Sequence, residues 1–278
     1  MSAPEIFSLL ARRQRRDRAA AGFDDFRFLY DFMAEGIAER LGAVKRDFTD
    51  MLDLGCWDAS FPAPPGANVT RCDSGEVFAR NAGGVQADED RLPFADGSFD
   101  LVVAIGTLDT VNDLPGALTL IRRALRPDGL FLGAFLGAGS LATLRRALMQ
   151  AERDRPAARL HPQIDVRSAG DLLARAGFAL PVADTESLNV RYGDLFALLR
   201  DLRGMAATNV MRDRAPLSRT TLAAAAQAFA ELADPDGRTR ERFEVITVTG
   251  WTPDPSQPKP ARRGSATASL AEALKPKG

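Results

Sequence analysis

Four groups of polar residues follow short apolar segments of the sequence, and their types suit the binding of a nucleotide-like cofactor. They are residues 53–57, Asp73, Asp88 and residues 106–110. In an open parallel α/β sheet, ligands bind at the carboxyl ends of the strands, where such residues meet. Asp73 stands eighteen residues after Gly55, a separation at which a carboxylate can reach the hydroxyls of a bound ribose. A strand-end aspartate is also a common turn-former, so the spacing leaves both interpretations open.

The loop after the first apolar segment departs from a glycine-rich cofactor loop, because LDLGCWDASFPAPPG (52–66) carries a tryptophan and three prolines. Glycine tolerates positive φ and close ligand approach, whereas Trp57 carries a large indole and prefers ordinary φ values. Each proline inside a helix costs about 3 kcal/mol, so at most one helical turn is expected here. Trp57 either fills a vacated pocket as an aromatic floor or forms a lid on a ligand. Trp57 or Phe61 packed among Gly55, Asp73 and Asp88 would favour a non-catalytic protein.

Few side chains remain for acid–base chemistry. Asp109 follows the apolar segment 99–106, and it is interpreted equally as an acceptor for an amino group or as the N-cap of the next helix. His161 is the single histidine of the chain, and a structural loop residue is at least as good an interpretation as an active-site group. Acid–base work would otherwise fall to carboxylates or to Tyr192.

The order of apolar segments predicts the elements that position these residues. Short apolar strands separated by turns and helices indicate an open, mostly parallel α/β sheet with helices on both faces. Strands are predicted at 50–54, 67–72, 99–106, 129–135, 179–192 and 241–251, and helices at 114–125, 140–154, 168–178, 193–206 and 218–233. Ser168 is the predicted N-cap of its helix, and Gly177 its C-terminal cap.

Three regions follow from composition and periodicity. Residues 1–42 form an N-terminal helical extension, 43–252 an α/β domain with a helical insertion, and 253–278 a largely disordered tail with a short helix from Leu270. The basic cluster ARRQRRDR (11–18) is interpreted as a solvated helix face in preference to a docking surface for an acidic partner.

Composition excludes several classes of protein. The net charge is -1, from 36 basic and 37 acidic residues, which gives no reason to expect nucleic acid or an anionic membrane as a partner. Cys56 and Cys72 are the only cysteines, so neither a disulfide framework nor a metal centre is expected, and a cytoplasmic location fits best. Cys56 is interpreted as a small buried residue. The apolar runs are too short for a transmembrane segment, and the N-terminus lacks a secretory pattern.

Several motifs resemble those of the class I S-adenosylmethionine-dependent methyltransferases, which have a Rossmann-like fold. They are LDLGC (52–56), Asp73, ADEDRLPFADGSFDLVV (87–103) and LRPDGLFLGAF (125–135). More narrowly, VNDLPGAL (111–118), DLRGMAATNV (201–210), TLAAAAQAF (221–229) and PARRGSATASLAEAL (260–274) resemble the complex I assembly factor 5 branch. That branch of arginine hydroxylases is related to the malonyl-carrier-protein methyltransferases of biotin synthesis. The resemblance runs from about residue 6 to residue 274.

The resemblance implies a cofactor site for S-adenosylmethionine. It assigns Asp53, Gly55, Trp57, Asp73 and Asp88 to that site, with Gly55, Asp73 and Asp88 at the methionine, ribose and adenine parts. Two departures stand out. The interval from Asp53 to Asp73 is a few residues shorter than in the family, and Asp109 with Thr110 stands where the branch has an aromatic or histidine-containing pair.

Three functional hypotheses follow. The main one is an S-adenosylmethionine-dependent methyltransferase-like protein that acts on an unknown acceptor, such as a protein or a carboxylate. The resemblance implies a second, the hydroxylation of an arginine in an iron–sulfur subunit of respiratory complex I. The third is a non-catalytic relative that binds such a client during assembly. The altered loop favours the third, whereas the retained Asp73 and Asp88 count against complete loss of the site.

Overall fold

A seven-stranded sheet forms the centre of the molecule. The computed structural model describes residues 5–152 and 157–257, and within them the strand order is β3-β2-β1-β4-β5-β7-β6. Strands β1 to β5 pair in parallel, whereas β7 runs antiparallel to both β5 and β6. The predicted mostly parallel α/β fold is confirmed. The strands are β1 (Asp50–Leu54), β2 (Asn68–Asp73), β3 (Val85–Gln86), β4 (Phe99–Ile105), β5 (Leu125–Leu136), β6 (Ala179–Tyr192) and β7 (Thr239–Trp251).

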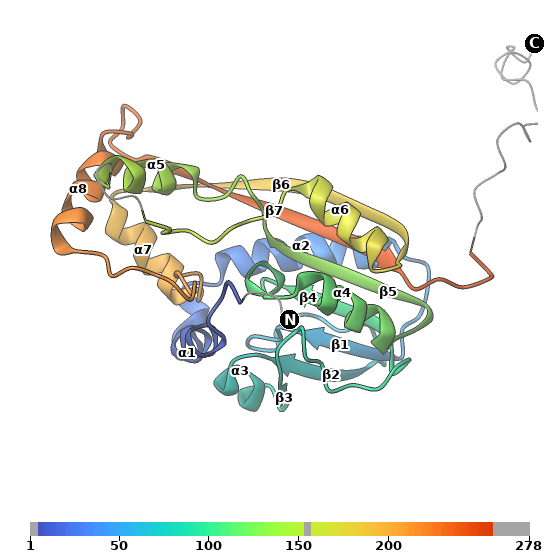
Figure 1. Cartoon of the computed structure of the whole chain (residues 1–278). Helices are drawn as coiled ribbons and strands as arrows, with labels where there is room; N and C mark the ends of the chain where they lie inside the picture. The colour runs from blue at the N-terminus through green and yellow to red at the C-terminus, as the bar shows by residue number, and fades with distance from the viewer. Residues whose placement is uncertain (1–4, 153–156, 258–278) are drawn as a thin grey trace, which may run out of the picture.

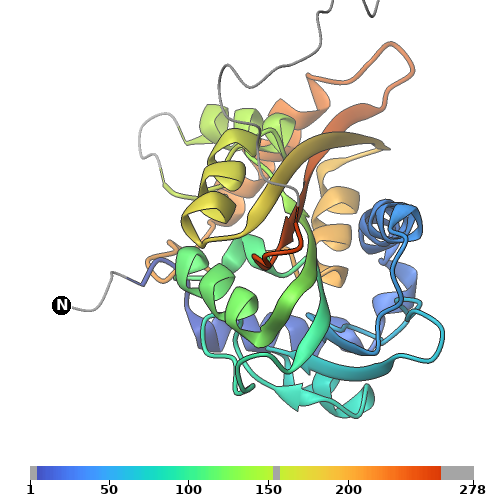
Figure 2. The ribbon, with the colours of Figure 1, turned by 90° about the vertical axis from the view of Figure 1, so that its right-hand side faces the viewer.

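Helices cover both faces of the sheet, as Figure 1 and the side view in Figure 2 show. Helices α4 and α6 lie on one face, and α2 lies on the other. Helices α5, α7 and α8 gather beside the long β6–β7 pair, and α1 lies beyond the carboxyl ends of β1 and β2 (Figure 1). The helical elements are α1 (Leu9–Ala20), η1 (Phe23–Asp25), α2 (Phe28–Ala43), α3 (Glu76–Asn81), η2 (Leu108–Thr110), α4 (Leu114–Ala124), α5 (Ala142–Ala151), α6 (Val166–Arg175), α7 (Leu195–Gly204) and α8 (Arg219–Ala230).

The central strands are buried on both faces. Every residue of β4 is buried, which is the pattern of a parallel strand covered by helices on each side. Its alternate side chains divide between two apolar clusters: Leu101 and Val103 pack toward α2, whereas Val102 and Ala104 pack toward α4 and α6. These strands therefore hold the loops at their carboxyl ends on a rigid base.

Aspartate side chains begin several helices, so the N-cap prediction for Ser168 was wrong, as was the N-cap interpretation of Asp109. Helix α6 is capped by Asp165, whose carboxylate accepts from the amide of Ser168, so the helix starts before the predicted cap. Helix α4 is capped by Asp113, which accepts from Gly116, and Asp109 lies instead in the short helix η2. In each case an aspartate near the predicted cap supplies the acceptor that the first turn needs.

Three further expectations concern the rest of the chain. No helix forms over the proline-containing residues 59–67, as their composition predicts. The predicted short helix from Leu270 and most of the predicted tail lie outside the described residues. Among the residues that the structure describes, no helix is long and apolar enough to cross a membrane.

Candidate functional site

The loop after β1 uses its own backbone donors within the protein. The amides of Gly55 and Cys56 donate to the carbonyl of Cys72 over 2.8 and 3.1 Å, and the amide of Trp57 donates to Asp73 Oδ2 over 3.2 Å. Gly55 has a φ of +73°, and a Cβ there would come within 2.7 Å of Thr107 Cβ. The glycine therefore serves close packing against Thr107, and the three amides are not free to hold a ligand.

The indole of Trp57 is packed into the interior above this loop. It is 4% exposed, stacks on Phe23 with ring centroids 4.7 Å apart, and donates from Nε1 to the carbonyl of Ile105 over 2.8 Å. Its φ is +45°, contrary to the expected ordinary value, which costs of order 1 kcal/mol or more in a residue other than glycine. Phe61 is buried in the same apolar cluster. Trp57 therefore packs as an aromatic floor that fills the pocket, and not as a lid over a ligand.

The carboxylate of Asp73 is completely buried and paired with an arginine. Arg16 Nε donates to Oδ1 over 2.7 Å and Arg16 Nη2 donates to Oδ2 over 2.5 Å. Oδ1 also accepts from the amide of Gly75, and the Arg16 guanidinium lies 3.8 Å above the indole centroid of Trp57. Together with the Trp57 amide, protein groups donate four hydrogen bonds to this one carboxylate.

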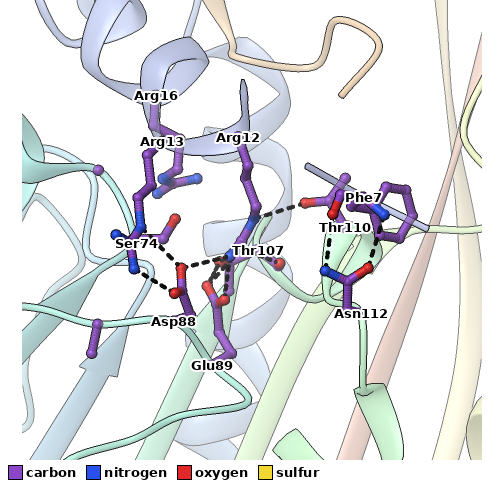
Figure 3. Close-up of polar contacts among 12 residues, drawn as sticks. Phe7, Arg12, Arg13, Arg16, Ser74, Asp88, Glu89, Thr107, Thr110 and Asn112 are labelled. Carbon is purple, nitrogen blue, oxygen red and sulfur yellow. Dashed lines mark hydrogen bonds and ion pairs between the residues drawn. The ribbon is translucent and has the colours of Figure 1, made fainter. Parts of the chain in front are cut away.

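Two more acidic side chains, Asp88 and Glu89, are also paired with arginines of α1, as Figure 3 shows. Arg12 binds Glu89 through two hydrogen bonds of 2.5 and 2.7 Å, and it also donates to the Thr107 carbonyl. Arg13 donates to Asp88 over 2.5 Å. Burial opposes ionisation of Glu89, but the Arg12 charge prevails and holds the pKa of Glu89 below its ordinary value. Three neighbouring carboxylates at the end of the sheet are therefore bound by one helix.

These contacts contradict the interpretation of residues 11–18 as a solvated face. Arg12 and Arg16 are each 4% exposed, because they stand one turn apart on the side of α1 that faces the sheet. The acidic groups that Arg12 and Arg16 bind are carboxylates of the protein itself. Sequence reasoning missed both of these arginines and Glu89. The sequence signal that could have indicated these ion pairs is the four-residue spacing of the arginines together with the cluster of acidic residues near residue 88.

A small cavity remains between α1 and the loops. Its volume is about 60 Å³, and Arg12, Arg16, Trp57, Gly106 and Asp109 contribute to its walls. Burial raises the pKa of the Asp109 carboxyl, although the charges of Arg12 and Arg16 oppose that rise. The structure therefore brings Asp109 to this end of the sheet with Asp73 and Asp88.

His161 lies close to Asp109 but has a structural role as well. The two side chains share the wall of a smaller cavity of about 20 Å³. The Nε2 atom of His161 accepts from the amide of Val210 over 2.9 Å, and its ring packs edge-on against Phe7. Burial lowers the pKa of His161, although the Asp109 charge opposes this. A neutral imidazole is therefore held between the backbone amide of Val210 and the ring of Phe7.

Tyr192 is not brought to the site. It is buried at the end of β6 among residues of α7, and burial followed by the nearby Asp201 and Glu241 carboxylates raises its pKa. Among the described residues no group of three or more histidine, cysteine, aspartate and glutamate side chains could hold a metal ion. Cys56 and Cys72 are both buried and free.

The buried carboxyl of Asp53 should make the stability of the folded protein depend on pH. It is 3% exposed, and burial, with smaller contributions from the charges of Asp73 and Asp58 against that of Arg71, raises its pKa to about 7. The unfolded chain releases this proton near pH 4. Between these values the folded state binds the extra proton, so stability should fall as pH rises, by at most about 1.4 kcal/mol per pH unit.

The measurement is the melting temperature of wild type and Asp53→Asn from pH 5 to pH 8. The wild-type curve should fall more steeply, and the variant should be the more stable of the two at pH 8. The difference between the curves isolates Asp53 from the other groups that titrate in this range. Parallel curves would contradict the assigned ionisation.

Comparisons with known proteins show the family of this chain. Residues 52–133 match the family model described as a methyltransferase domain. The zebrafish arginine-hydroxylase NDUFAF5, mitochondrial, is 34% identical over 97% of this chain and 90% of its own length, and the human protein of that name is 35% identical over 96% and 83%. The malonyl-[acyl-carrier protein] O-methyltransferase of Laribacter hongkongensis is 31% identical over 85% of this chain and 87% of its own.

Solved structures share the fold. The YcgJ protein of Bacillus subtilis superposes with a TM-score of 0.55 at 13% identity, over 80% of this chain and 99% of its own. Phosphoethanolamine N-methyltransferase 2 of Haemonchus contortus, solved with S-adenosyl-L-methionine, gives a TM-score of 0.51 at 16% identity, over 87% of this chain and 60% of its own. These likenesses concern the arrangement of strands and helices.

Proposed function

Because this chain belongs to the methyltransferase-fold family that includes the NDUFAF5 arginine hydroxylases, we propose that it is a non-catalytic assembly factor for respiratory complex I. In this proposal it binds a protein client, such as an iron–sulfur subunit, while its ancestral cofactor pocket stays closed. Residues 1–42 act as an extension that closes the domain formed by residues 43–252. The tail from residue 253 is a third region in this division of the chain.

The observation that carries the proposal is the buried ion pair of Arg16 and Asp73. The resemblance to methyltransferases implies that the Asp73 carboxylate would bind the hydroxyls of the cofactor ribose. Those hydroxyls would need acceptor positions that now bind the Arg16 guanidinium and the amides of Gly75 and Trp57. A ligand would have to break a charge-assisted bidentate pair, which is among the stronger polar interactions in proteins.

The residues present do not fit S-adenosylmethionine in this conformation. The amides of Gly55 and Cys56 are bound to Cys72, and the Trp57 indole fills space beside Gly106. The remaining cavity of about 60 Å³ is far below the roughly 300–1,000 Å³ of small-molecule sites. We therefore assign no step of a reaction to that cofactor.

The partner and the location are also part of the proposal. The resemblance to complex I assembly factor 5 supports a client in that complex. Both cysteines are free and buried, which suits a reducing compartment. We place the protein in the cytoplasm of its source cell, and the names of its mitochondrial relatives make the mitochondrion the alternative.

A second candidate function is a cofactor-dependent enzyme, either a methyltransferase or a hydroxylase, in which α1 withdraws. One observation favours it. Asp73, Asp88 and Glu89 remain at the carboxyl end of the sheet, and all three are closed off by one helix that lies outside the sheet. A buried ion pair is often no more stabilising than apolar packing, so retaining the buried pairs Arg12–Glu89 and Arg16–Asp73 is consistent with a site that opens.

Titration calorimetry separates the two functions. Wild-type protein should give no binding heat with S-adenosylmethionine or S-adenosylhomocysteine up to concentrations on the order of 1 mM. A dissociation constant of that size corresponds to a binding free energy of only about 4 kcal/mol. Binding at micromolar concentration that Asp73→Ala abolishes would favour the enzyme and reject the closed pocket.

The assembly function needs its own test. Deleting the gene should reduce NADH:quinone oxidoreductase activity in membranes of the source organism, and the wild-type gene should restore it. A gene carrying Asp109→Asn should restore it equally, because the proposal requires no proton transfer at the cavity. Failure of a folded Asp109→Asn protein to complement would contradict a non-catalytic role, and unchanged activity after deletion would contradict a role in complex I.

A further inference from the structure

A larger cavity lies apart from the closed site, between helices α5, α7 and α8. Its volume is about 250 Å³. Leucines form most of its wall, among them Leu148 of α5, Leu199 of α7 and Leu222 of α8. A cavity of this size and lining resembles the apolar part of a small-molecule site more than a packing defect. Its interior is suited to a hydrocarbon chain.

Positive charge gathers at one side of this cavity. Arg15, Arg159 and Arg214 belong to its wall. Arg159 is engaged, because it binds Glu152 and donates to the carbonyls of Ala215 and Pro216. Arg15 and Arg214 form no ion pair with any carboxylate in residues 5–152 and 157–257.

Two polar atoms in the same wall are buried without a hydrogen-bond partner. They are Arg15 Nε and Thr208 Oγ1. Burial and the charges of Arg18, Arg214 and Arg203 lower the pKa of Arg15, so its surroundings are basic rather than compensating. Buried polar groups in folded proteins are nearly always paired, and an unpaired donor costs free energy. An anionic acceptor placed here would satisfy the donor and relieve the repulsion among the guanidinium groups.

We propose that this cavity binds a single-chain fatty acid, with its hydrocarbon chain among the leucines and its carboxylate on Arg15 and Arg214. The apolar wall selects against a free inorganic anion, and two guanidinium groups without a carboxylate partner select against a neutral chain. Arg159 holds the segment at residues 215–216, which forms part of the cavity wall. The proposal does not rest on the proposed assembly function.

Binding at this site has a consequence for helix α1. Arg15 lies on the same helix as Arg12 and Arg16, which close the cofactor pocket. A carboxylate bound to Arg15 would add a contact that holds α1 in place. The fatty acid would therefore stabilise the closed conformation.

Calorimetry with three probes tests the proposal on the full-length protein. Decanoate should bind at least about tenfold more tightly than decanol, because only the carboxylate forms charge-assisted hydrogen bonds with the arginines. Vesicles of phosphatidylglycerol should not bind, since the cavity accepts one chain. Equal affinity for decanoate and decanol would reject the assigned arginines, and binding to vesicles without binding to decanoate would identify a lipid surface instead.

Substitutions locate the binding. Arg15→Met keeps the apolar stem and Arg214→Met changes an exposed residue; each should weaken decanoate binding by about tenfold. Arg146→Met removes an exposed arginine of α5 that does not belong to this cavity, and it should leave the affinity unchanged. Leu199→Trp should abolish binding by filling the apolar part. The proposal would be overturned if Arg15→Met, Arg214→Met and Leu199→Trp all left the affinity unchanged. The absence of decanoate binding at millimolar concentration would overturn it as well.

Discussion

Replacing Arg16 by methionine is expected to lower the free energy of unfolding by about 3–5 kcal/mol, because the Asp73 carboxylate then stays buried without a counter-charge. Both side chains of the pair are at most 5% exposed, so water cannot replace the guanidinium at little cost. The amides of Gly75 and Trp57 still donate to the carboxylate, but neither carries a charge. Urea unfolding of the wild type and the variant measures the difference.

Two matched variants show whether the charge is the cause. Arg16→Met combined with Asp73→Asn should recover most of the lost stability, because the amide is neutral and keeps an oxygen for the Gly75 donor. Arg13→Met removes an arginine of the same helix whose side chain is 40% exposed, and it should cost less than about 1 kcal/mol. A loss below about 1 kcal/mol for Arg16→Met itself would mean that solvent reaches Asp73.

These ion pairs also explain how a strongly basic helix packs on a protein sheet. Helix α1 presents Arg12 and Arg16 to the interior together with the small residues Ala11 and Ala19. Small side chains allow the helix to approach closely, and the guanidinium groups then reach Glu89 and Asp73. Because each arginine needs its own carboxylate, the pairs fix one position of the helix.

Much of the fold followed from local patterns. The strands at residues 99–105 and 50–54 are short apolar runs, and the helix at residues 114–124 is ended by the segment that contains Pro127 and Gly129. The prolines between residues 62 and 65 correctly predicted the absence of a helix after the first loop. Such features depend on neighbours in the chain, which a sequence displays directly. Helix starts were less certain, because several aspartates near a start can each act as the cap.

The closure of the site could not be predicted in this way. A run of arginines on a helix is ordinarily solvated. Only the folded chain brings the side chain of Arg16 into contact with the carboxylate of Asp73, which is distant in the sequence. Nor does the net charge of -1 indicate which charges pair. Trp57 shows the same limit, since its bulk suggested a changed loop but its stacking partner Phe23 is 34 positions away in the chain. Contacts between distant segments decided whether the retained acidic residues are accessible.

The double variant Arg16→Ala, Trp57→Gly is expected to gain binding of S-adenosylhomocysteine. The first change frees the Asp73 carboxylate for the two hydroxyls of a ribose, and the second removes the indole beside Gly106. Glycine also relieves the backbone at residue 57, where φ is +45°. We expect the dissociation constant to fall from above about 1 mM to the order of 10 μM, a change of about 2.7 kcal/mol. Titration calorimetry and the ligand-induced rise in melting temperature both measure it.

The control for this gain is the same double variant with Asp73→Asn added. The asparagine keeps the size of the side chain but loses the charge and one acceptor, so it should bind at least about tenfold more weakly if the ribose hydroxyls contact Asp73. Equal binding in both backgrounds would place the ligand elsewhere. No binding in the double variant would show that the side chains of Arg16 and Trp57 are not the main obstacle. The loop amides that donate to Cys72 would then be the stronger barrier, because their positions are fixed by the pairing of β1 with β2.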